Sequence, residues 1–181
     1  MTPTETLKHE HHVILMVLKA AARELSFIDE RESVHGATVE QMVDFFRHFA
    51  DECHHAKEEQ HLFPAMVRRG VAQENGPIGV MLHEHELGRG FVRQIAESVN
   101  AAAAGDSQAR EQLRSALDSY ITLLRQHIDK ENKVLFPLAD SVLTDDDQKQ
   151  LQEAFDRVEA EEMGDGVHEK YHQLAHDLTE S

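Results

Sequence analysis

The sequence predicts an all-α protein: an up-down-up-down four-helix bundle with an internal two-helix duplication and a C-terminal helical appendage. Two observations support this prediction. Apolar residues recur at helical spacing along the whole chain, and no alternating strand pattern appears. The stretches 54–64 and 127–137, offset by 73 residues, share the frame H-x-x-K-E-x-x-x-L-F-P. A unit of two helices is therefore used twice, and long helices with short connections form such bundles.

The first two helices carry clear boundary signals. Thr2 is a cap, Pro3 suits the first helical position, and Glu5 completes a capping box. The apolar stripe that follows places His11 where a core residue belongs. The second helix is expected over residues 37–69, before a glycine-containing loop.

The third and fourth helices repeat this arrangement. An Asn-Gly-Pro break at 75–77 precedes the third helix, whose apolar stripe contains His85. A Gly-Asp pair at 105–106 ends that helix and caps the next one. The fourth helix has His127 and Glu131 in the middle of its apolar face. Polar residues in core positions of several helices indicate a shared polar site.

Residues 1–142 are expected to form the bundle, and residues 143–181 a helical extension packed on it. The extension carries histidines that share one helical face: His168, His172 and His176. We expect this face to be exposed to solvent, and a second metal site is the alternative.

Composition narrows the classes of function. A net charge of −16 over 181 residues disfavours nucleic acid and anionic membranes as partners. The single cysteine, Cys53, excludes an internal disulfide and a thiolate cluster, so any metal is held by nitrogen and oxygen. Neither a leader nor an apolar run of about 20 residues is present, so we expect a cytoplasmic protein.

The candidate metal ligands follow from two repeats. A His-x-x-x-Glu pair directs an imidazole and a carboxylate to one point, because residues four apart share a helix face. The duplicated frame contains two such pairs, and His-Glu-His at 9–11 and 83–85 adds a histidine from each remaining helix. Buried ionisable groups are costly unless paired or metal-bound, so we favour a metal site over a structural polar network. The predicted ligands are His11, His54, Glu58, His85, His127 and Glu131.

The register of the second helix is ambiguous, because His54 with Glu58 and His55 with Glu59 have the same spacing. The duplicated Leu-Phe-Pro aligns His54 with His127 and therefore favours the first pair. We expect a solvated or supporting role for His55, Glu59 and His61. The nitrogen and oxygen donors favour iron, manganese or zinc over calcium.

With these motifs the chain resembles the bacterial hemerythrin-like family with the HHE cation-binding domain, over residues 5–140. The resemblance implies a centre of two iron ions, oxo- or hydroxo-bridged, with manganese or zinc as substitutes. The four histidines would be nitrogen ligands, and Glu58 and Glu131 bridging carboxylates. The chain departs from oxygen-carrying hemerythrins at Arg89, four residues after His85, where they have a second histidine. One imidazole fewer leaves an additional open metal position.

The resemblance thus implies a protein that presents an open di-metal site to dioxygen, peroxide or nitric oxide, in sensing or detoxification. One alternative is a di-iron peroxidase or oxidase, in which the open positions turn over a substrate. Another is an iron-responsive interaction module, in which iron occupancy stiffens the bundle. The expected ligand is a small diatomic molecule or peroxide, and the sequence identifies no protein partner.

Overall fold

The computed structural model describes residues 1–181, apart from the side chain of residue 162. The described chain is all-helical, as predicted, and contains no strand. Several π-helical segments, labelled η, interrupt the longer helices. In chain order the elements are α1 (Pro3–Arg31), α2 (Gly36–Phe45), η1 (Phe46–His55), η2 (Glu58–Leu62), α3 (Phe63–Arg68), α4 (Pro77–Ala103), α5 (Ser107–Lys130), η3 (Glu131–Leu135), α6 (Phe136–Val142), α7 (Asp145–Arg157), η4 (Val158–Met163) and α8 (Val167–Glu180).

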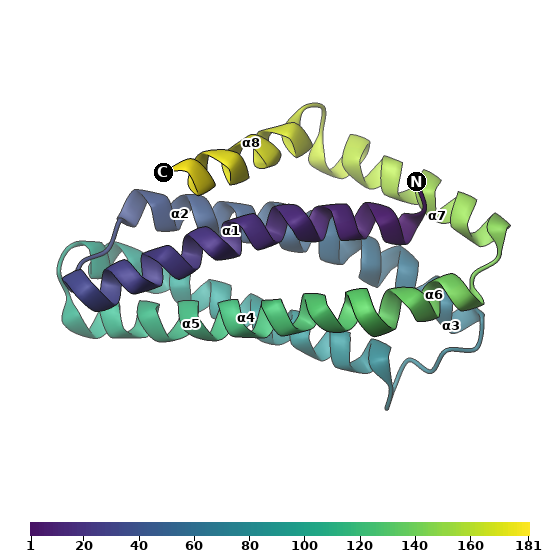
Figure 1. Ribbon diagram of the computed structural model, residues 1–181, viewed down its shortest axis with the longest axis horizontal. Helices are drawn as coiled ribbons and strands as arrows, with labels where there is room; N and C mark the ends of the chain where they lie inside the picture. The colour runs from purple at the N-terminus through teal and green to yellow at the C-terminus, as the bar shows by residue number, and fades with distance from the viewer.

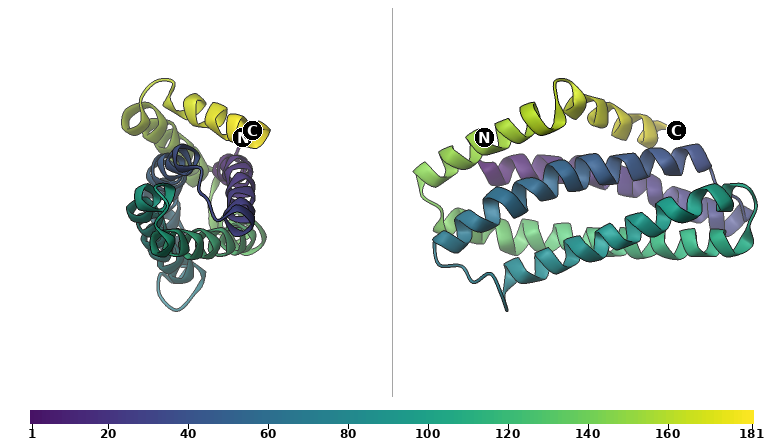
Figure 2. Two further views of the ribbon diagram at one scale, coloured as in Figure 1. Left: turned by 90° about the vertical axis from the view of Figure 1, so that its left-hand side faces the viewer. Right: turned by 180° about the vertical axis from the view of Figure 1, so that it is seen from behind.

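Figures 1 and 2 show α1, α2, α4 and α5 lying lengthwise alongside one another, with α3 and α6 continuing two of them. The C-terminal helices α7 and α8 lie over the outer side of α1 and α2. Arg23 on α1 fixes the end of α8 by donating hydrogen bonds to the carbonyl oxygens of Leu178 (2.5 Å) and Thr179 (3.0 Å). The ring of Tyr171 packs edge-on against Phe45. The extension thus packs on the rest of the chain.

The helix boundaries follow the capping signals of the sequence. The Thr2 hydroxyl accepts from the Glu5 amide (3.3 Å), and the Glu5 carboxylate accepts from the Thr2 amide (2.7 Å). The Asp106 carboxylate accepts from the backbone amide of Ala109 at 2.8 Å, where α5 begins. Each of these bonds satisfies an amide that the helix itself leaves unpaired.

The buried side chains form two apolar clusters with a polar layer between them. Along α1, Leu7 belongs to one cluster and Ile14 to the other, and His11 lies between them. Along α4, Met81 belongs to the same cluster as Leu7 and Val92 to the same cluster as Ile14, and His85 lies between them. Such burial anchors the polar side chains on rigid elements. None of the described helices combines the length and apolar composition needed to cross a bilayer.

Candidate metal centre

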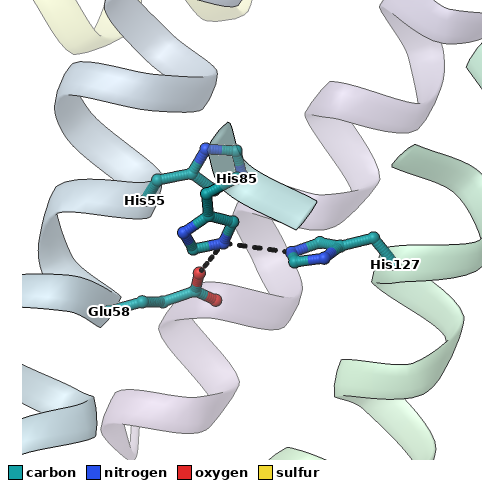
Figure 3. Close-up of side chains that lie close together, drawn as sticks. All are labelled: His55, Glu58, His85 and His127. Atoms are coloured by element: carbon teal, nitrogen blue, oxygen red, sulfur yellow. Dashed lines mark hydrogen bonds and ion pairs between the residues drawn. The ribbon is translucent and has the colours of Figure 1, made fainter. Parts of the chain in front are cut away.

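The six predicted ligands lie together in the polar layer, and each is at most 1% exposed. Together with His55 they form two groups that share Glu58, and in each group one donor atom per residue lies within 4.8 Å of the others. Figure 3 shows the second group, whose side chains converge from η1, η2, α4 and α5. The first group is His11, His54, Glu58 and Glu131, and the second is His55, Glu58, His85 and His127.

The two buried carboxylates connect the groups. Each turns one oxygen toward a histidine of the first group and its other oxygen toward a histidine of the second. The contacts are Glu58 Oε1–His54 Nε2 (3.4 Å), Glu58 Oε2–His85 Nε2 (3.2 Å), Glu131 Oε2–His11 Nε2 (3.6 Å) and Glu131 Oε1–His127 Nε2. This is the arrangement that carboxylates bridging two cations require.

Six of the donor atoms also lack a hydrogen-bond partner in the described part of the chain. All four oxygens of Glu58 and Glu131, and Nε2 of His11 and His54, are buried without a hydrogen-bond partner among the described residues. Burial and the adjacent Glu131 carboxylate raise the pKa of Glu58. Groups of this kind destabilise a fold by several kcal/mol unless a partner or a cation compensates them. Nitrogen and oxygen donors without thiolate suit iron, manganese or zinc, so the residues fit a metal pair.

His55 departs from the sequence prediction. The solvated role is wrong, because the residue is only 5% exposed, while the supporting role stays a prediction. Its ring stacks on that of His85 with centroids 3.8 Å apart, and it belongs to the second donor group. The predicted continuous helix over 37–69 is interrupted by the wide π segments η1 and η2, which rotate later residues relative to the α-helical register. Two adjacent histidines can therefore both reach the centre.

Each imidazole of the centre bonds to an acceptor through Nδ1, which leaves Nε2 for the metal position. Such partners fix the ring orientation and the tautomer. The pairs are His11–Asn132 Oδ1 (2.8 Å), His54–Glu10 Oε1 (3.0 Å), His55–Asp51 Oδ1 (3.2 Å), His85–Glu59 Oε1 (2.8 Å) and His127–Glu84 Oε1 (3.0 Å). Glu59 therefore has the supporting position that the sequence favours, at 25% side-chain exposure.

The residues that support the imidazoles recur at the offset of the sequence duplication. Glu10 and Glu84, which orient His54 and His127, are 74 residues apart, and Glu59 and Asn132 are 73 apart. The lysines of the H-x-x-K-E frame have the same role in both halves, because each binds the supporting glutamate of the neighbouring helix. The frame showed that both lysines recur, but it did not reveal these partners.

Burial keeps most of the imidazoles neutral, which is the form that binds a metal. It lowers the pKa of His54 to about 4, and with the neighbouring rings it lowers those of His55 and His85 to about 3. His127 differs: burial opposes its protonation, but the Glu131 carboxylate outweighs this and raises its pKa.

A third group of acidic and histidine side chains, Glu10, Glu159 and His168, joins the extension to this support. The Lys57 ammonium already lies between the two carboxylates, 2.5 Å from Glu10 Oε2 and 2.7 Å from Glu159 Oε1. A cation is therefore in place, so we assign no metal to this group. Of the predicted histidine face, His168 is 28% exposed rather than fully solvated.

We expect Lys57→Ala to destabilise the protein by about 3–5 kcal/mol, because its removal leaves buried, unpaired carboxylate charge. Its counterpart Lys130 is 42% exposed, whereas Lys57 is 0% exposed. We therefore expect Lys130→Ala to have an effect of about 1 kcal/mol or less. Chemical denaturation of the two variants and the parent chain measures the difference. Equal losses would show that the environment of Lys57 is no more demanding than that of Lys130.

Comparison with known proteins agrees with this site. Residues 2–139 match the family model described as Hemerythrin HHE cation binding domain. An uncharacterised protein of Mycobacterium tuberculosis is 26% identical over 168 residues, which are 91% of this chain and 64% of that protein. The iron-sulfur cluster repair protein YtfE of Pectobacterium atrosepticum is 31% identical over 135 residues, 73% of this chain and 59% of the relative.

The chain thus spans less than two thirds of the length of these relatives. No solved structure matches it at a significant level. The family match covers all the buried donors described above. The protein is accordingly a metal-binding protein, and the chain belongs to the hemerythrin HHE cation-binding domain family.

Proposed function

We propose that the centre binds two iron ions bridged by Glu58 and Glu131 and presents them to dioxygen, peroxide or nitric oxide, in sensing or detoxification. The observation that carries the proposal is the contact of each buried carboxylate with both histidine groups. Bound iron would supply a redox-active site for such small ligands. The similarity to a relative named for iron-sulfur cluster repair supports an iron-linked role.

The two metal positions would be unequal. His11 and His54 would hold one ion, and His55, His85 and His127 the other. His55 would thus supply the imidazole that the sequence lacks at Arg89, and fewer positions would stay open than four imidazoles would leave. The residue 73 positions after His55 is the buried, apolar Ile128. The inequality is therefore a property of the duplicated sequence itself.

We expect His55→Ile, which copies the other half of the duplication, to weaken one ion selectively. The control is Asp51→Asn, because Asp51 accepts from the His55 ring but belongs to neither donor group. Loss of a supporting group lowers metal affinity by roughly 10- to 100-fold, and loss of a direct ligand should exceed that. Titration against a competing chelator measures both constants. A His55→Ile variant that binds both ions as tightly as the parent would exclude His55 as a ligand.

The function is tested by adding dioxygen, hydrogen peroxide or nitric oxide to anaerobically iron-loaded protein while the optical spectrum and iron content are followed. A spectral change with one of them, without catalytic turnover, supports sensing or scavenging. Sustained consumption of peroxide supports the peroxidase alternative instead. If none of the three ligands changes the spectrum of protein with both ions bound, the proposed function is wrong.

A further inference from the structure

A cavity of 220 Å³ adjoins the centre between η1, α4 and α5. His55 and His85 form its buried wall, and the arginines Arg47, Arg89 and Arg93 line it as well. Pockets for ordinary ligands measure about 300–1,000 Å³, and a water molecule takes about 30 Å³. This arginine-lined cavity therefore suits a molecule of only a few heavy atoms.

Tyr120 provides a hydrogen-bond donor inside the cavity. Tyr120 is 2% exposed, and it lines the cavity together with His55 and His85. Burial raises the pKa of this phenol, so the hydroxyl keeps its proton. A phenol hydroxyl that keeps its proton can donate a hydrogen bond to an acceptor in the cavity. Tyr120 therefore favours an occupant with an acceptor atom.

Gly88 keeps space open beside Tyr120. A Cβ at this position would lie 3.5 Å from Tyr120 Cε2, in ordinary contact, so a larger side chain would extend into the cavity. Glycine in the middle of a helix is unfavourable relative to alanine. A ligand that occupies the space beside Tyr120 would explain why α4 has glycine at position 88.

The charges around the cavity favour an anion. Arg89 is held by Asp51 and Glu59, with N–O distances of 3.0 Å, and so braces the residues that support His55 and His85. Arg47 and Arg93 are exposed and have no ion-pair partner among the described side chains. In a chain with a net charge of −16, they create a local positive region that attracts anions.

We infer that the arginine-lined cavity binds a small monovalent anion of one to three heavy atoms. Arg47 and Arg93 attract the anion, and the Tyr120 hydroxyl donates a hydrogen bond to it beside His55 and His85. Anion binding in the cavity does not require a metal. A second role, in which the cavity guides ligands to the metal centre, rests on the proposed function. The centre would then favour anionic ligands over neutral ones.

Tyrosine fluorescence tests the anion site without any metal. The sequence has no tryptophan and two tyrosines, so Tyr171→Phe leaves Tyr120 as the sole emitter. Iodide should quench this metal-free protein several-fold more strongly than caesium at equal ionic strength. Arg47→Gln with Arg93→Gln should remove the difference, and Gly88→Leu should suppress quenching by both ions.

The matched control is Arg31→Gln with Arg68→Gln, which changes the net charge equally at exposed arginines outside the cavity. In this control, iodide and caesium should quench Tyr120 fluorescence to the same extents as in the parent. Equal quenching by iodide and caesium in the parent, or an identical response of both arginine pairs, overturns the inference. Gly88→Ala replaces Gly88→Leu if the larger side chain prevents folding, and it should reduce quenching in part.

A second measurement tests the connection to the metal centre. Azide should associate with the iron-loaded protein about three- to tenfold more slowly in the Arg47→Gln, Arg93→Gln variant at low salt, and the difference should shrink at high salt. An unchanged rate in protein with both ions bound overturns the role as an approach route. Failure to bind iron would instead refute the proposed function, and the iodide result would still decide the anion site.

Discussion

Glu58→Leu is expected to stabilise the metal-free protein and to abolish its metal-bound state. Glu58 is 0% exposed, and neither carboxylate oxygen has a hydrogen-bond partner among the described residues. A buried carboxyl group without a partner costs a fold several kcal/mol, so an apolar side chain of similar volume should stabilise the metal-free protein. The same change removes an oxygen donor from both histidine groups. Thermal melting with and without iron, together with iron analysis, measures both effects.

Glu58→Leu is expected to raise the stability of the metal-free protein but to remove its iron binding, and this combination distinguishes a metal site from a structural polar network. A purely structural polar network would lose stability on Glu58→Leu whether or not iron is added. Glu52→Leu is the control, because this carboxylate lies on η1, just before the segment that carries Glu58, but is 62% exposed. It should change neither the iron content nor the melting temperature appreciably. A Glu58→Leu protein that still takes up two irons would refute the bridging role.

Removing iron from the parent protein is expected to lower its melting temperature strongly. A ligand that binds only the folded state stabilises it by about 4 kcal/mol per site when its free concentration is 1,000 times Kd. For a domain of this size each kcal/mol corresponds to roughly 2–4 °C. We therefore expect a fall of at least about 8 °C after chelation, recovered when iron is restored.

Glu58→Leu again supplies the control for this measurement, because its melting temperature should not respond to the chelator. An unchanged melting curve of the parent after verified removal of iron would mean that the folded state gains nothing from the metal. The buried carboxylates would then have to be compensated within the protein.

Most of the centre could be predicted where the chain keeps regular α-helical register. His11, His85 and His127 each interrupt an apolar stripe, and the structure buries all three at 1% exposure. His54 and Glu58 lie on a segment whose stripe is not informative, and only the duplication placed them. The burial of His55 was not predicted because a π segment changes which side chains face inward, and no propensity of the individual residues signals such a segment.

The supports of the centre were harder to predict because their partners are distant in sequence. Lys57 and Glu159 are 102 residues apart, and the pair forms only because the extension packs over the first helices. The same packing makes the duplicated lysines differ, since Lys57 is buried and Lys130 is 42% exposed. The repeated motif thus predicts that the two lysines make equivalent ion pairs, whereas the surrounding fold determines how deeply each ion pair is buried.

The most direct test of the central claim is the number of irons bound per chain. Anaerobic titration of metal-free protein with ferrous iron, followed by removal of free metal and elemental analysis, gives this number. The account predicts two irons per chain, falling below one in Glu58→Leu. A single iron per chain at saturation, with the second position empty, would contradict a pair of ions bridged by Glu58 and Glu131.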